Sequence, residues 1–139
     1  MVVGYNAGLI FTSPRNTAMP RHTIHSSEQI QARLQAELPD WRLADGQLQR
    51  RIRTADFRTA LLLTNAIGHL AEQAWHHPDI QLGWGVVTVS LVSHDVGGIT
   101  NRDFEMAARI DELVGWQPAT DSALDGTPDE DRWRYLVRD

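Results

Sequence analysis

The sequence predicts an α+β fold in which helices cover one face of a single antiparallel sheet. Two observations predict it: short alternating strand patterns come in neighbouring pairs, and segments with helical periodicity stand before, between and after them. The order is helix, hairpin, long helix, strand pair, helix, which favours one sheet with its helices on one side. A chain of 139 residues suffices for one domain with a hydrophobic core and is too short for two.

The first helix is expected to begin after Ser26 and to end before Pro39. Ser26 and Gln29 make a capping-box pattern, in which each side chain satisfies a backbone N–H of the first turn. Pro39 ends the helix because its ring clashes with a continuing turn. The apolar residues between these signals stand at helical spacing: Ile30, Leu34 and Leu38.

A β-hairpin and a long helix follow. Residues 41–43 and 48–53 alternate in polarity and flank Asp45-Gly46, a strong signal for a tight hairpin turn. Residues 56–74 show helical periodicity over about five turns, and Pro78 requires this helix to have ended by His77. The expected buried stripe of this helix comprises Phe57, Ala60, Leu61, Thr64, Ile67, Ala71 and Ala74, widened by Leu63 and Leu70.

The last strand and the last helix lie on either side of a Gly97-Gly98 turn. Residues 86–92 are rich in β-branched side chains and read as a strand, with Val87, Val89 and Leu91 on one face. Thr100 is expected to cap the final helix together with Asp103 three residues later. The buried face of that helix is expected at Phe104, Ala107, Ile110 and Val114.

Composition excludes several classes of function. The formal net charge of −5 argues against a nucleic-acid partner, and the absence of cysteine excludes disulfides and thiol catalysis. Without an apolar run of about 20 residues, no membrane-spanning segment is predicted. We therefore expect a cytoplasmic protein with three parts: a flexible extension at residues 1–24, an α+β domain at 25–115, and an acidic linker with a Trp-containing tail at 116–139.

Three histidines stand where structural elements end. His76 and His77 come at the end of the long helix, where the helix dipole favours a protonated imidazole, and His94 follows the last strand. Histidine can both give and take protons near neutral pH, so the three rings are expected to meet around one cavity as an acid–base site. Zinc is a weaker alternative, because adjacent residues at a helix end point about 100° apart and seldom bind one ion.

The joint spacing of these residues resembles the pattern of the pterin-4a-carbinolamine dehydratases. Glu72-x-x-x-His76-His77-Pro78 is followed by five residues to Trp84, nine to His94 and eight to Asp103. The resemblance covers residues 26–114. Its flanking matches are Leu38-Pro39-Asp40-Trp41, Ala55-Asp56-Phe57, Leu70-Ala71-Glu72 and the segment 98–103.

The resemblance implies a four-stranded antiparallel sheet with three helices on one face, in the order α-β-β-α-β-β-α, and a homodimer or homotetramer built partly by pairing of sheet edges. It implies a hydro-lyase that converts a 4a-hydroxytetrahydropterin to the quinonoid dihydropterin, in tetrahydrobiopterin recycling, without metal or cofactor. His76 and His94 would be the acid and the base, and His77 would hydrogen-bond the substrate. Substrate-binding roles are expected for Glu72, Trp84 and Asp103, although Asp103 is equally explained as a helix cap.

A non-catalytic role on the same fold is the alternative. Relatives of this family act as dimerisation partners of a transcription factor or as assembly factors for the carbon-fixing carboxylase RuBisCO. Three features of this chain motivate the alternative. Trp75 stands where an Asp or Asn is common, Val92 where a Ser is common, and residues 133–137 form an apolar tail that is expected to bind a protein partner.

Overall fold

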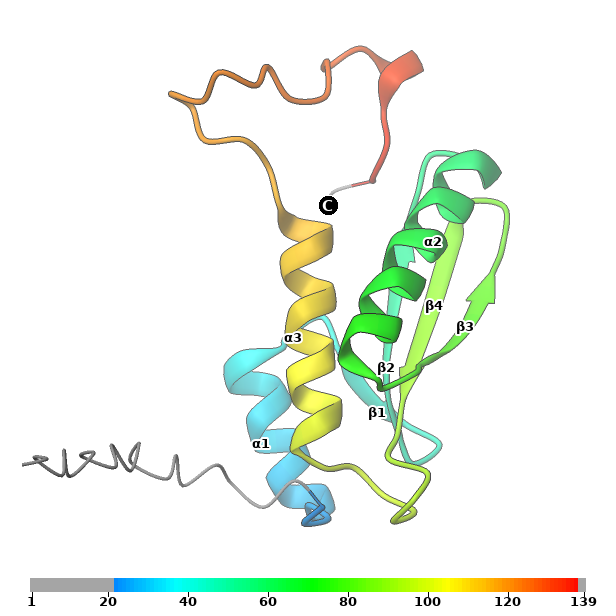
Figure 1. The fold of residues 1–139 in the computed structure, drawn as a ribbon, viewed down its shortest axis with the longest axis vertical. Coiled ribbons are helices and arrows are strands. Elements are labelled where there is room, and N and C mark those ends of the chain that lie inside the picture. Colours follow the sequence, from blue (N-terminus) through cyan, green and yellow to red (C-terminus); the bar gives the residue numbers. More distant parts are fainter. Residues whose placement is uncertain (1–21, 138–139) are drawn as a thin grey trace, which may run out of the picture.

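The computed structural model describes residues 22–137, which form a four-stranded antiparallel sheet with three α-helices on one face (Figure 1). The predicted fold class is confirmed. Of the predicted extension at 1–24, residues 1–21 lie outside the described part of the chain. In chain order the elements are α1 (Ser27–Glu37), β1 (Arg42–Ala44), β2 (Gln47–Arg53), α2 (Phe57–Ala74), β3 (Asp79–Leu82), β4 (Val86–Leu91), α3 (Asn101–Gly115) and a short 3-10 turn, η1 (Asp131–Trp133).

The strand order in the sheet is β1-β2-β4-β3, so β4 lies in the centre beside β2. The hairpin between β1 and β2 turns at Asp45 and Gly46, both with positive φ angles of 52° and 73°. Two positive φ angles in a two-residue turn match the right-handed twist of the strands, as the Asp-Gly pair predicted. β4 pairs along six residues of β2, from Leu48↔Leu91 to Arg53↔Val86.

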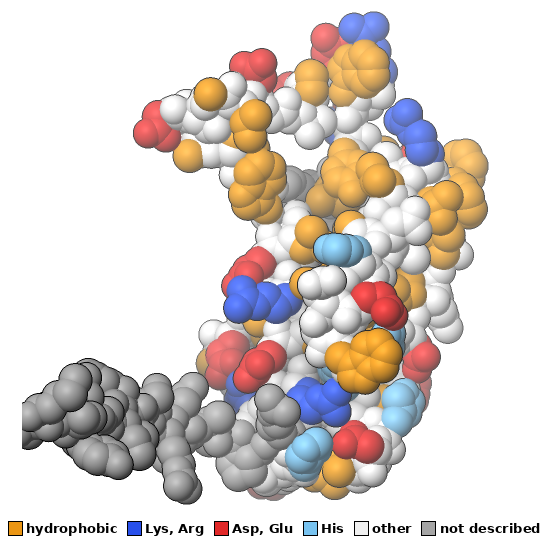
Figure 2. All heavy atoms as spheres, in the orientation of Figure 1, with side chains coloured by type: hydrophobic (Ala, Val, Ile, Leu, Met, Phe, Trp, Pro, Cys, Tyr) orange, Lys and Arg blue, Asp and Glu red, His pale blue; other side chains and the backbone are white. Residues whose placement is uncertain are grey.

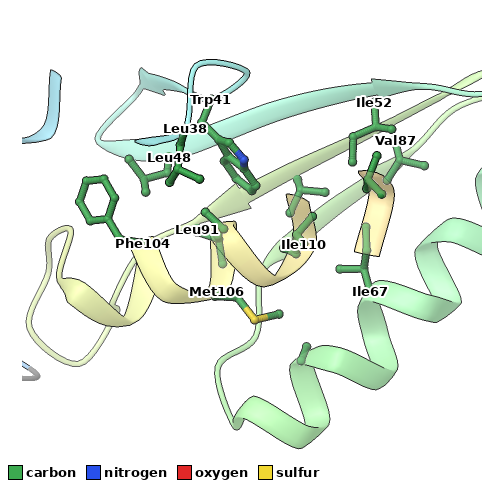
Figure 3. Close-up of a cluster of buried hydrophobic side chains, with 14 of the residues drawn as sticks. Leu38, Trp41, Leu48, Ile52, Ile67, Val87, Leu91, Phe104, Met106 and Ile110 are labelled. Atoms are coloured by element: carbon green, nitrogen blue, oxygen red, sulfur yellow. The ribbon is translucent and has the colours of Figure 1, made fainter. Parts of the chain in front are cut away.

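The hydrophobic core lies between the sheet and the helices (Figure 3). Alternate residues of β2 and β4 face it, because successive side chains of a strand point to opposite faces. The predicted inward face of β4 is confirmed, and so is the predicted stripe of α3. The fully buried members of the core are Leu48, Ala60, Ile67, Val87, Val89, Leu91, Ala107 and Ile110.

The buried stripe of α2 agrees with the prediction only in part. Phe57 and Leu61 are 45% and 43% exposed, and Ala74 is also exposed. The predicted residues Ala60, Leu63, Ile67 and Ala71 are buried, and Thr59, which was not predicted, is buried with them. Because α2 is apolar around much of its circumference, its sequence does not show how far the buried stripe extends, and packing against β4 and α3 decides that.

The C-terminal segment returns to the sheet. Leu136 forms an isolated antiparallel bridge with Thr54, just beyond the end of β2, and packs against the core. Two backbone hydrogen bonds of 3.1 Å hold it, from Val137 N–H to the Arg53 carbonyl and from Ala55 N–H to the Tyr135 carbonyl. Burial raises the pKa of the Tyr135 phenol. Because β1 pairs only with the start of β2, this bridge covers part of an edge that would otherwise be open.

Between α3 and this bridge the chain bows outward, as the upper part of Figure 2 shows. The segment partly encloses an open hollow of about 1240 Å³, whose lining includes Trp116, Trp133 and Tyr135. The ion pairs of this segment are local, from Arg132 to Glu130 and from Arg134 to Asp131. Among the described residues, no helix has the length and apolar character needed to cross a membrane.

Replacing Leu136 with Ala should lower the free energy of unfolding by about 1–2 kcal/mol. This is less than the roughly 2–5 kcal/mol typical of fully buried leucines, because Leu136 is only partly buried. Chemical denaturation measures the change. Leu124→Ala is the matched control, since Leu124 lies in the same segment and is 60% exposed. Equal effects of the two changes would contradict a docked C-terminal segment.

Asp56 caps α2 and gives a prediction for acid stability. The Thr59 N–H donates to its carboxylate over 2.9 Å and lowers the pKa of Asp56 below its ordinary value of 3.8. Because the pKa of Asp56 is lower in the folded than in the unfolded protein, the cap contributes its full stability above pH about 3.8. This stability is lost as the pH falls through the pKa of the folded protein. Asp56→Asn keeps a capping oxygen that does not titrate. We expect the melting temperature of the variant to fall less than that of the wild type between pH about 5 and 2; parallel curves would contradict this assignment.

Candidate functional site

The site is built at the C-terminal end of α2, where Trp75 reverses the direction of the backbone. Trp75 adopts the left-handed conformation, with φ 50° and ψ 42°. The backbone N–H groups of Trp75 and of His76 both donate to the Ala71 carbonyl, which closes the helix. A bulky residue with positive φ is uncommon, and the conformation costs about 1–2 kcal/mol for a side chain with a Cβ. The turn sends the two following histidines into different environments.

His76 points into the protein and is 8% exposed. Its Nε2 atom lies 2.7 Å from Oδ1 of Asp103, which is fully buried on the first turn of α3. The two residues are 27 positions apart in sequence. This contact therefore joins the end of α2 to the start of α3.

Asp103 is surrounded by hydrogen-bond donors. Its Oδ2 atom receives the Ser93 hydroxyl at 2.8 Å and the Thr100 backbone N–H at 2.9 Å. Its position on the first turn of α3 favours negative charge, because the helix dipole is positive there. No arginine of the described residues forms an ion pair with it. The carboxylate is thus stabilised by a helix end, a hydroxyl, an amide and the His76 ring.

The donors and acceptors of this network follow from the charge of Asp103. An ionised carboxylate can only accept, so Ser93 and His76 Nε2 must donate to it. With its one proton used, the Ser93 oxygen accepts from the Thr100 hydroxyl, 2.8 Å away, and the Thr100 oxygen accepts from the Arg102 N–H at 3.2 Å. Neutral His76 then carries its proton on Nε2 and has a free lone pair on Nδ1.

The second ring nitrogen of His76, Nδ1, takes no part in this network. Nδ1 has no hydrogen-bond partner among residues 22–137. Every buried side-chain nitrogen or oxygen in that part of the chain does have a partner. Nδ1 must therefore be the accessible nitrogen of an otherwise buried ring. An accessible lone pair on a ring of fixed orientation is suited to accept a proton from a bound molecule.

His77 is exposed and lies beside Glu72, one helical turn earlier. Its Nε2 atom is 2.7 Å from Glu72 Oε1, which orients the ring. The Trp75 indole meets the His77 ring edge to face, with ring centroids 5.2 Å apart and planes at 79°. Among residues 22–137, Glu72 thus forms its hydrogen bond with His77, whereas His76 forms its own with Asp103. The surface near this end of α2 carries histidines, acidic residues and a large apolar side chain (Figure 2).

His94 lies on the turn after β4 and is exposed. Its neighbour Ser93 is tied to Asp103, and its other neighbour Asp95 lies 3.8 Å from Arg102. Arg102 also donates to the Trp75 carbonyl at 3.0 Å, so it links the backbone before His76 to the turn that carries His94. The structure therefore brings the two histidine-bearing segments together through these links. It shows no direct contact between the rings in the described part of the chain.

Trp84, which is expected to bind substrate, does not lie beside the histidines of the same chain. Trp84 is 74% exposed in the turn between β3 and β4, at the opposite end of this hairpin from His77 and His94. Ser93 and Arg102 were missed from sequence. The position of Ser93 directly before His94 could have marked it as a site residue. Nothing in the sequence showed that its hydroxyl would donate to Asp103. Among the described residues, no three His, Asp or Glu side chains form a group that could hold a metal ion.

Comparison with known proteins agrees with this architecture. A family model described as pterin 4 alpha carbinolamine dehydratase matches residues 23–113. A protein of Microcystis aeruginosa, assigned by name to the pterin-4-alpha-carbinolamine dehydratases, is 45% identical over 98 residues, which cover 68% of this chain and 84% of the relative. A relative of the same name from Nocardia farcinica is 42% identical over 89 residues, or 64% of this chain and 93% of the relative.

Among solved structures, a transcriptional coactivator/pterin dehydratase from Brucella melitensis is similar, with a TM-score of 0.61 and 27% identity. The similarity covers 67% of this chain and all of that chain. The matched region ends near the last turn of α3, so the C-terminal segment lies outside it. As the spacing of its histidines predicted, the chain belongs to the pterin 4 alpha carbinolamine dehydratase family.

Proposed function

We propose that this protein dehydrates a 4a-hydroxytetrahydropterin to the quinonoid dihydropterin by general acid–base catalysis. In this reaction the C4a–O bond breaks and the hydroxyl leaves as water after it takes a proton from an acid. The proton on N5 passes to a base, and its electron pair forms the C4a=N5 double bond. The reaction needs one proton donor and one proton acceptor, which histidines near neutral pH can both supply.

The observation that carries this proposal is the state of His76. Its Nε2–H is committed to the buried Asp103 carboxylate, and its Nδ1 lone pair is the accessible nitrogen. An imidazole held in one tautomer by a buried carboxylate is a good base, and the same carboxylate stabilises the imidazolium that forms. His94, on the turn anchored by Ser93, is the partner acid in this proposal.

His77 and Glu72 have a binding role in the proposal. Both are exposed, and their 2.7 Å contact holds the His77 ring at the C-terminal end of α2. An oriented imidazole can donate to, or accept from, the polar edge of a pterin. Asp103 is fully buried and therefore does not contact the substrate in this proposal. Its role is to orient His76 through their direct hydrogen bond.

Replacing His76 and His94 together with Gln should lower the dehydration rate by about 10²–10⁴ or more, since proton transfer by a positioned side chain contributes about that much. Gln at position 76 keeps an N–H for the Asp103 carboxylate, so the fold should persist; a His76→Ala change would leave a buried charge unpaired. Turnover of freshly generated 4a-hydroxytetrahydropterin is measured by absorbance.

His69→Gln is the control for this experiment, because His69 is an exposed histidine of α2 away from its C-terminal end. It should retain the full rate. Full activity in the double variant would refute acid–base catalysis by these histidines. A folded wild-type protein without any turnover would favour the non-catalytic role.

Ser93→Ala should lower kcat by about tenfold or more, with KM little changed. Without the Ser93 hydroxyl, Asp103 loses a donor and the tautomer of His76 is less firmly fixed. The ¹⁵N chemical shifts of the His76 ring report the tautomer directly. Ser93→Thr should restore both kcat and the tautomer, because it restores the hydroxyl. Ser90→Ala, in β4, is the control; an unchanged tautomer in Ser93→Ala would sink the role given to Ser93.

A further inference from the structure

Trp75 combines two unfavourable features at the edge of the candidate site. It is a bulky residue held in the left-handed conformation, at φ 50°, and its large apolar side chain is 72% exposed. Among the described residues only Asp45 shares a positive φ without being glycine, and Asp45 lies in a tight turn that requires it. Strained residues that persist at functional sites suggest a function that compensates for the strain.

The local structure does not explain why a tryptophan stands here. Gly and Asn adopt the left-handed conformation at a helix end with little strain, and they would close α2 equally well. The Arg102 side chain binds the backbone carbonyl of Trp75, so any residue at this position could make that bond. Among residues 22–137, the indole is not part of the hydrophobic core, and its one ring contact is with His77.

The geometry of that contact leaves the indole available to a ligand. His77 meets it edge to face, so His77 can cover no more than one face of the indole. The indole stands beside His77 and on the residue before His76, whose Nδ1 is accessible. A flat bicyclic ring such as a pterin can stack on an exposed indole through dispersion and offset π contact.

We propose that Trp75 is a substrate-binding residue whose indole forms the stacking platform for the pterin ring. This inference rests on the proposed function for the identity of the ligand. The strained backbone of Trp75 serves the site in two ways, because the left-handed turn directs His76 inward and holds the indole outward beside His77.

Trp75→Asn should have opposite effects on stability and on binding. The variant removes the platform, so the Kd for 7,8-dihydrobiopterin, measured by isothermal titration calorimetry, should rise about tenfold. It also relieves the strained backbone, so the melting temperature should rise. A residue that served only the fold would lower stability when replaced. KM for the substrate should rise with Kd while kcat changes little.

Two further variants make the experiment specific. Trp75→Phe retains an aromatic ring in the strained conformation, and it should bind with intermediate affinity and show no gain in stability. Trp116→Asn replaces another exposed tryptophan, which caps the C-terminal end of α3, far along that helix from Asp103, and should leave Kd unchanged. A Trp75→Asn variant that binds as tightly as the wild type, or that is less stable, would overturn the proposal.

The outcomes for the wild type separate the two proposals. If the wild type binds the pterin without turnover, the dehydratase function is contradicted. The stacking platform is still supported in that case if Trp75→Asn weakens binding. If the wild type turns over substrate but the wild type and Trp75→Asn bind the pterin with equal affinity, the dehydratase function is supported and the stacking platform is contradicted. Absence of both binding and turnover would overturn both.

Discussion

The arrangement of the site depends on the buried carboxylate of Asp103. A fully buried charge is costly unless donors surround it, and in this chain the donors come from three separate places: the end of α2, the turn after β4 and the cap of α3. Satisfying one carboxylate therefore requires these three segments to meet. The same requirement fixes the direction of each hydrogen bond and, through them, the protonated nitrogen of His76.

The left-handed turn at Trp75 explains how two adjacent histidines come to lie in different surroundings. In a continuing helix their side chains would point about 100° apart on one surface. The reversal at Trp75 instead buries His76 against Asp103 and leaves His77 exposed beside Glu72. One ring is held by a buried network and the other by an exposed carboxylate, which gives the two imidazoles different surroundings within a few ångströms of backbone.

The sheet supplies a rigid frame for this arrangement. β4 lies in the centre, hydrogen-bonded on both sides, and the turn that follows it carries Ser93 and His94. The helices that carry His76 and Asp103 pack on the face of the same sheet (Figure 1). β1 is too short to pair with all of β2, and the bridge made by Leu136 covers part of the remaining edge. This bridge lies at the end of β2 that is far from the histidines.

Local patterns in the sequence by themselves determined most of the elements. The capping boxes at Ser26 and Thr100, the Asp-Gly turn and the alternation in β4 are interactions between near neighbours, so short windows of sequence contain them. The histidine spacing also identified the family. Only the tertiary structure decided which members of the predicted α2 stripe are exposed, that Glu72 contacts His77, that Trp84 lies away from the histidines, and that Ser93 reaches Asp103. Each of these depends on how elements distant in sequence pack against one another, and no local pattern encodes that packing.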